Sequence, residues 1–291
     1  MRPLVDIFKP EYCFRPRNIV NRMRLSLDRS GTIRTKTAWG ARLEVVANDT
    51  IGHSIMQFGV YDLTVSEALS RLVDRGDLCV DGGANIGYTA LLMATRVGDG
   101  RVLAFEPHPQ LWQSMEQNIA LNSELGAHIE LHQSALGPEA GPGLLKVPEA
   151  FHDNCGTSSM ATDAVGQGIG VDVVRLDDLL GSQTVGLFKL DVEGFEPDVV
   201  RGSLESFKRR RVRDFVYEHN ETDADRVGDM IRPCGYSQFK ISKRWHRPAL
   251  TSITSAHGST WEPENRLLTL DPKRAQQRFR KFGWMSLKPL A

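Results

Sequence analysis

Two apolar runs each end in an acidic residue, and a glycine-rich turn follows the first of them. The runs read LCVDGGANIGY at residues 78–88 and RVLAFE at residues 101–106, so that Asp81 and Glu106 stand at their ends. Glycines occupy positions 82, 83 and 87, where the absence of a Cβ lets the backbone pass close to a ligand. A carboxylate at the end of a strand can accept hydrogen bonds from both hydroxyls of a ribose. Such a unit holds an adenosine-containing cofactor across the carboxyl edge of a parallel sheet.

The spacing of the glycines separates two kinds of cofactor. A dinucleotide fingerprint needs glycine at its first, third and sixth positions, so that a pyrophosphate can lie on the helix N-terminus. Counted from Gly83, the third position is Asn85 and the sixth is Tyr88, so the fingerprint fails twice. An acid just before the turn repels a pyrophosphate but suits the ammonium group of a methionine moiety. The pattern therefore favours S-adenosylmethionine over a nicotinamide or flavin cofactor. A turn that binds no ligand is the remaining alternative.

A second group of acids follows another apolar strand, in the run VGLFKLDVEGFEP at residues 185–197. Asp191 ends this strand, and Glu193 lies in the turn after it. A further strand over residues 214–217 leads into Glu218. Because α/β enzymes carry their chemistry at the carboxyl edge of the sheet, we expect these carboxylates to lie near the reacting groups.

Transfer of a methyl group from a sulfonium to a hydroxyl requires alignment, exclusion of water and a base. The base takes the proton of the alcohol, which is otherwise a poor nucleophile. We expect it among Asp191, Glu193 and His152. The acids Asp191, Glu193 and Glu218 could also bind a divalent metal ion, but no fixed ligand spacing supports a metal site, and none is predicted.

The polar segment over residues 148–160 connects the third strand to the Asp191 strand. A long connection of this kind can fold over the carboxyl edge of a sheet. It offers His152 and Asp153 to bind or deprotonate an acceptor, and Phe151 to shield the methyl group from water. A surface loop without such a role is the alternative. We expect acceptor specificity to depend on residues 1–60, 137–171 and 242–265.

The order of apolar and helical segments predicts an α/β domain with a doubly wound, mostly parallel sheet. Residues 66–73 have apolar positions at helical spacing, and Asn85 is expected to cap a helix over residues 86–96. A loop-rich stretch is expected over residues 137–171. The other expected elements are β-like pieces over 32–47, a mixed segment over 51–60, a helix over 109–122, strands over 128–133 and 171–176, and an antiparallel pair of 235–241 with 266–271. Three regions are expected: an N-terminal extension or cap over residues 1–65, a cofactor-binding domain over 66–272, and a basic C-terminal tail over 273–291.

The bulk composition is that of a soluble enzyme. The 291 residues include 36 basic and 36 acidic side chains, so no global field attracts nucleic acid. Four cysteines without a CxxC pair are typical of a reducing compartment, and we expect a cytoplasmic protein. No apolar run approaches the ~20 residues of a membrane span. The N-terminus also lacks the apolar core of a signal peptide.

Five motifs together resemble the FkbM-type methyltransferases, a family of class I S-adenosylmethionine-dependent enzymes. In order they are DGGANIGY from Asp81, FEPHP from Phe105, NIALN from Asn118, SALG from Ser134 and KLDVEGFE from Lys189. The resemblance covers about residues 50–271. It implies a seven-stranded sheet of Rossmann-like form with one antiparallel strand, and S-adenosylmethionine as the methyl donor.

The resemblance also implies roles for individual residues. The methionine part of the cofactor would lie among Asp81, Gly83, Ala84, Asn85 and Gly87. Glu106 would bind the ribose, Pro107 would lie against the adenine edge, Ser134 and Ala135 would contact adenine, and Asp191 would lie near the sulfonium.

Many members of the family methylate oxygen atoms of sugars and natural products. We therefore expect an O-methyltransferase that acts on a hydroxyl of a small molecule. The alternatives are an NAD(P)-dependent oxidoreductase and a catalytically silent S-adenosylmethionine-binding module. The expected partners are the small-molecule acceptor and, through the N-terminal extension, a second copy of the chain; nucleic acid is not expected.

Overall fold

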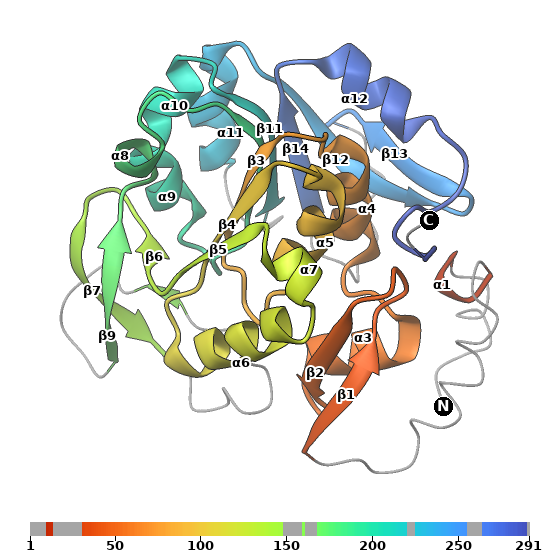
Figure 1. The fold of residues 1–291 in the computed structure, drawn as a ribbon. Helices are drawn as coiled ribbons and strands as arrows, with labels where there is room; N and C mark the ends of the chain where they lie inside the picture. The colour runs from red at the N-terminus through yellow and green to blue at the C-terminus, as the bar shows by residue number, and fades with distance from the viewer. Residues whose placement is uncertain are drawn as a thin grey trace.

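The computed structural model describes residues 10–13, 31–147, 159–160, 168–219, 225–254 and 264–289. The central sheet consists of β3 (Leu78–Gly82), β4 (Arg101–Phe105), β5 (Ile129–His132), β10 (Val185–Leu190), β11 (Val212–His219), β12 (Ser237–Arg244), β13 (Arg247–Thr251) and β14 (Glu264–Thr269). Their order across the sheet is β13-β12-β14-β11-β10-β3-β4-β5 (Figure 1).

Five neighbouring strands of this sheet are parallel, from β11 through β10, β3 and β4 to β5. β14 is antiparallel to β11, and β12 is antiparallel to β14. The predicted doubly wound, mostly parallel α/β sheet is therefore confirmed, including the antiparallel pairing of residues 235–241 with 266–271. β13 adds an eighth strand at the edge, antiparallel to β12.

Helices cover both faces of the sheet (Figure 1). One apolar cluster contains side chains of α4 (Leu63–Leu72), α5 (Tyr88–Val97), α6 (Pro109–Ala120) and α12 (Pro272–Phe279). The other contains side chains of α8 (Leu176–Leu180), α9 (Glu196–Gly202), α10 (Leu204–Lys208) and α11 (Arg226–Ile231). All residues of β3, β10 and β14 are buried, as expected for central strands with both faces covered. Polar chemistry is thereby directed to the ends of the strands.

The segment before the sheet is ordered by its own hydrogen bonds. β1 (Thr32–Lys36) and β2 (Arg42–Val46) form an antiparallel hairpin where β-like pieces were predicted. The mixed segment after it is α3 (Thr50–Phe58), which begins after Asp49 because this carboxylate accepts bonds from the first helical N–H groups. α4 begins three residues earlier than predicted, since Asp62 accepts in the same way from the backbone of Thr64 and Val65.

A smaller sheet lies beside the main one. It contains β6 (Ala135–Leu136), β7 (Gly141–Lys146), β8 (Ser159–Met160) and β9 (Ile169–Val174), in the order β6-β9-β7-β8. The prediction of a loop-rich stretch over residues 137–171 was wrong at β7. Gly141, Pro142 and Gly143 favour a turn when considered locally, but pairing with β9 holds them in a strand.

The basic residues near the C-terminus make ion pairs within the fold. On α12, the guanidinium of Arg274 lies 2.6 Å from a carboxylate oxygen of Asp74 and 2.7 Å from one of Asp214. Arg278 also pairs with Asp74. Within the described part of the chain, no helix is both long and apolar enough to cross a membrane.

A buried ion pair lies within α4, and both of its members also bind the backbone at or after the end of α12. Arg71 Nε lies 2.7 Å from Glu67 Oε2, and both side chains are fully buried. The Arg71 guanidinium also donates to the carbonyl oxygens of Arg278 and Gly283, each at 2.6 Å. Glu67 Oε1 in turn accepts from the backbone N–H of Ser286 at 2.6 Å. The segment that follows α12 is therefore part of the folded core.

Candidate active site

A cavity of about 460 Å³ opens at the carboxyl ends of β3, β4, β10 and β11. Its walls carry more acidic than basic side chains. The acids are Glu11, Asp62, Glu106, Asp191, Glu193 and Glu218, and the bases are Lys189 and Lys243. Such an excess of acidic groups suits a ligand that carries positive charge.

The glycine-rich turn between β3 and α5 forms one wall through Gly83, Ala84 and Asn85. Gly83 has a φ of +74°, and a Cβ at this position would lie 1.9 Å from the carbonyl oxygen of Asp191. The N–H groups of Gly83 and Ala84 donate to the carbonyl oxygen of Phe105 at 3.1 and 2.9 Å. Glycine at 83 is thus required by contact between two loops of the protein, in addition to the predicted approach of a ligand.

Asn85 does not cap the next helix, so this prediction was wrong. α5 begins at Tyr88, and its N-cap residue is Gly87, which has no side chain to accept a capping bond. The Asn85 side chain instead accepts from the backbone N–H of Ile86 at 2.8 Å. Asn85 itself has a φ of +51°, which turns its backbone N–H toward the next strand end. Gly87 does not line the cavity.

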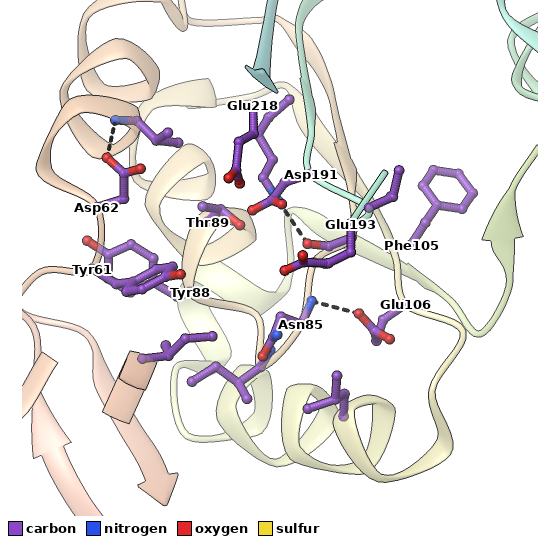
Figure 2. Close-up of a pocket in the computed structure, with 18 of the residues that line it drawn as sticks. Tyr61, Asp62, Asn85, Tyr88, Thr89, Phe105, Glu106, Asp191, Glu193 and Glu218 are labelled. Atoms are coloured by element: carbon purple, nitrogen blue, oxygen red, sulfur yellow. Dashed lines mark hydrogen bonds and ion pairs between the residues drawn. The ribbon is translucent and has the colours of Figure 1, made fainter. Parts of the chain in front are cut away.

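Glu106 lies at the end of β4 and is 5% exposed. One carboxylate oxygen accepts from the N–H of Asn85 at 2.9 Å (Figure 2). The other accepts from the N–H of His108, also at 2.9 Å. Burial raises the pKa of Glu106 to about 7, although these two bonds act in the opposite direction. Each oxygen keeps a second lone pair, and the side chain lines the cavity.

The buried side chain of Lys189 contacts both the glycine-rich turn and Asp81 of β3. Lys189 Nζ donates to the carbonyl oxygen of Gly83 at 2.8 Å and lies 3.2 Å from Asp81 Oδ1. Burial lowers the pKa of Lys189, but the carboxylates of Asp81 and Asp191 outweigh it and raise the pKa overall. Asp81 is fully buried, accepts from Thr89 Oγ1 at 2.7 Å and does not line the cavity. It supports the turn from beneath.

Sequence reasoning gave Lys189 no role. The signal was present, because a lysine stands alone in the otherwise apolar strand VGLFKL, next to strands that end in acids. A lysine is almost never fully buried unless it is paired. Its position in β10 therefore indicates carboxylate partners at the same sheet edge.

Carboxylates gather at the ends of β10 and β11. Figure 2 shows Asp191, Glu193 and Glu218 directed into one space, with Tyr61 and Asp62 across from them. Burial, followed by the charge of Asp191, raises the pKa of Glu218 to about 8 and that of Glu193 to about 7. Burial and the same group of carboxylates raise the pKa of Tyr61 far above its usual value.

Glu193 has a φ of +54°, which is unusual for a residue other than glycine. Glu196 stabilises this turn, because its carboxylate accepts from the N–H of Val192 at 2.9 Å and of Gly194 at 3.3 Å. Glu193 is exposed and lines the cavity, which places it at the cavity mouth. Backbone strain of this kind is typical of functional sites.

The other predicted site residues are only partly within the described chain. Pro107, Ser134 and Ala135 line the cavity near Glu106. His152 lies outside the described residues, as do Phe151 and Asp153. Among the side chains that the structure describes, no three His, Cys, Asp or Glu residues are grouped so as to hold a metal ion.

All three segments that were expected to determine acceptor specificity contribute to the cavity wall. Those residues are Glu11, Thr50, Ile51, Ser54, Phe58 and Val60 from the first segment, Leu145 and Met160 from the second, and Lys243 from the third. Lys243 Nζ lies 2.8 Å from Glu11 Oε1, so α1 (Pro10–Cys13) is held against β12 by an ion pair. Tyr61 and Asp62 also line the cavity, although sequence reasoning did not place them in the site.

This chain is similar to several known methyltransferases. The Methyltransferase FkbM domain matches residues 81–237. Methyltransferase 1 of Beauveria bassiana is 34% identical over 145 residues, which cover 42% of this chain and 57% of that protein. The chain thus spans little more than half the length of this relative. The 31-O-demethyl-FK506 methyltransferase FkbM of Streptomyces tacrolimicus is 29% identical, with 54% of this chain and 70% of that protein covered.

Among solved structures, a methyltransferase FkbM from Methylobacillus flagellatus is similar, with a TM-score of 0.46 and 17% identity. The superposition covers 72% of this chain and 55% of that one. Because the Methyltransferase FkbM domain matches more than half of the chain, this protein belongs to the FkbM methyltransferase family.

Proposed function

We propose that this protein is an S-adenosylmethionine-dependent O-methyltransferase that acts on a hydroxyl of a small molecule, a sugar or a secondary metabolite. The observation that carries the proposal is one cavity in which Glu106, at the end of β4, shares the space with the carboxylates that follow β10 and β11. Family membership supports methyl transfer. The name of the Streptomyces relative, a 31-O-demethyl-FK506 methyltransferase, supports oxygen as the acceptor atom.

The residues present fit the proposed cofactor. Glu106 has both carboxylate oxygens fixed by backbone N–H groups, so it is oriented to accept from two ribose hydroxyls. The wall formed by Gly83, Ala84 and Asn85 would hold the methionine part, and the acidic excess suits its ammonium and sulfonium charges. Pro107, Ser134 and Ala135 would contact adenine. When bound, the cofactor supplies a methyl group that is already activated.

The protein then has three tasks: to orient the acceptor, to exclude water and to accept a proton. Asp191 would perform the last task; in support, it follows β10 directly and lines the cavity. Glu193 at the mouth is a second candidate, and His152 remains a prediction from the sequence. Acceptor specificity would come from the segments around α3, β7 and β12, which contribute to the cavity wall.

Calorimetric titration with S-adenosylhomocysteine and, separately, with NAD tests the cofactor. We expect S-adenosylhomocysteine to bind and NAD not to bind. Binding of NAD alone would instead support an oxidoreductase, the alternative within the same fold class. A screen of hydroxylated acceptors with a radiolabelled methyl donor then separates an enzyme from a silent cofactor-binding module, which would bind the donor and label none of them.

A further inference from the structure

Glu218 is a carboxyl group of the cavity to which the proposed function assigns no task. It lies on β11, which pairs in parallel with β10 so that Leu190 is opposite Tyr217. Asp191 and Glu218 are the next residues along the two strands, and both side chains line the same cavity. Two carboxylates on neighbouring strand ends repel each other when both are ionised, and this repulsion favours a proton on one of them.

The surroundings of this pair favour retention of that proton. Glu193 and Asp62 add negative charge on two sides, and Tyr61 faces the pair from the segment before α4 (Figure 2). The only ammonium among the described residues near Asp191 is Lys189, at 4.0 Å from Asp191 Oδ2. On the other side of β11, Glu218 is paired with Asn265, which is uncharged. Burial and these charges together raise the pKa of Glu218 to about 8.

We propose that Asp191 and Glu218 act as one carboxyl pair that holds a single proton and accepts a second one from the acceptor hydroxyl. This inference rests on the proposed function and extends it, because it gives Glu218 the task of holding a proton beside Asp191. Glu218 is in this sense a positioning residue. Asp191 is the group that faces the acceptor.

In the proposed step, one bond forms, one bond breaks and one proton moves. The acceptor oxygen forms a bond to the methyl carbon while the carbon–sulfur bond breaks, and its electron pair returns to sulfur, which becomes a neutral thioether. The hydroxyl proton moves to the ionised oxygen of the pair. Both carboxyl groups are then neutral, and release of one proton to water restores the starting state. A pair with a raised proton affinity is a better match to an alcohol proton than an isolated carboxylate.

The test is a pH titration of the ligand-free protein, monitored by NMR of its 13C-labelled aspartate and glutamate carboxyl carbons. The Glu218 and Asp191 signals are assigned by their loss in Glu218→Gln and Asp191→Asn. We expect the wild-type Glu218 signal to titrate well above the ordinary glutamate range, and its midpoint to fall by about 1 pH unit or more in Asp191→Asn, as for groups that titrate as a pair. Glu116→Gln, an exposed change on α6, should leave both midpoints unchanged.

A Glu218 midpoint in the ordinary range in wild-type protein would overturn the proposal, and so would a midpoint that Asp191→Asn does not move. If a variant fails to fold, the Glu218 carboxyl signal is assigned in wild-type protein through its own backbone resonances, so that the wild-type titration still decides the first of these. Because no cofactor is present, the result is independent of the proposed function. Failure of S-adenosylhomocysteine to bind would refute the proposed function without altering the titration.

Discussion

Replacement of Glu106 by glutamine should weaken binding of S-adenosylhomocysteine by about 30- to 1,000-fold, while the fold is retained. The carboxylate offers two charged acceptors to the ribose, and both are held in place by backbone N–H groups. A glutamine oxygen can replace only one of them. One charge-assisted bond is lost, at ~1.5–3 kcal/mol, and the other becomes neutral and about half as strong, so the total is about 2–4 kcal/mol.

The pKa of Glu106 provides a second, independent measurement. Burial raises this pKa to about 7, so near pH 7 about half of the ligand-free molecules carry the proton. Ribose hydroxyls bind the ionised form, and binding must therefore release about half a proton at this residue. Calorimetry in buffers of different ionisation enthalpy measures the release, and Glu106→Gln should reduce it by that amount. Affinity should also fall as the pH is lowered below 7.

The matched control is Glu116→Gln, which removes a charge from the exposed side of α6. It should alter neither affinity nor proton release. If folded Glu106→Gln binds S-adenosylhomocysteine as tightly as the wild type, the ribose does not lie at the end of β4 and the prediction is refuted. Circular dichroism and the urea midpoint establish that the variant is folded.

Three further outcomes are expected. Gly83→Ala should destabilise the protein, since the new Cβ would lie 1.9 Å from a backbone oxygen, whereas Gly170→Ala meets nothing within 4 Å; urea unfolding of the two variants tests this contrast. Arg71→Met should cost ~3–5 kcal/mol in the free energy of unfolding, because it leaves a buried carboxylate unpaired. The exposed change Arg75→Met should cost less than ~1 kcal/mol in the same assay. Since the folded-state pKa of Glu106 exceeds the unfolded value, the folded protein holds that proton more tightly, and stability should decrease by up to ~3 kcal/mol as pH rises from about 4.5 to 7. Glu106→Gln should lack this part of the pH dependence.

The sequence was sufficient to predict the parallel sheet and the position of the strand-end acids. Strands buried on both faces appear as short apolar runs, and the residue that ends each run must lie at the sheet edge. Glu106 and Asp191 could be placed in this way from local pattern alone. A further strand that leads into Glu218 was also predicted, and in the structure this strand lies beside β10.

The remainder of the site depends on contacts between residues distant in sequence. The backbone of Asp191 leaves no room for a Cβ at position 83, and the carboxylate of Asp81 pairs with the charge of Lys189. In each case the two residues lie more than 100 positions apart in the sequence. Local pattern does not encode such pairs. Asp62 escaped notice for a related reason, since a helix cap that also lines a cavity has the same local signature as any other cap.

The place of β14 in the sheet bears on how the protein folds during synthesis. β14 lies between β11 and β12, yet it follows both of them in the chain. Until residues 264–269 leave the ribosome, β11 has an unpaired edge and the pair of β12 and β13 has no strand to dock on. Both are surfaces on which other chains can pair. The FkbM match ends at residue 237, so a chain shortened to that boundary would keep the β11 edge open permanently. β14 thus completes the sheet from beyond the segment that matches the FkbM domain.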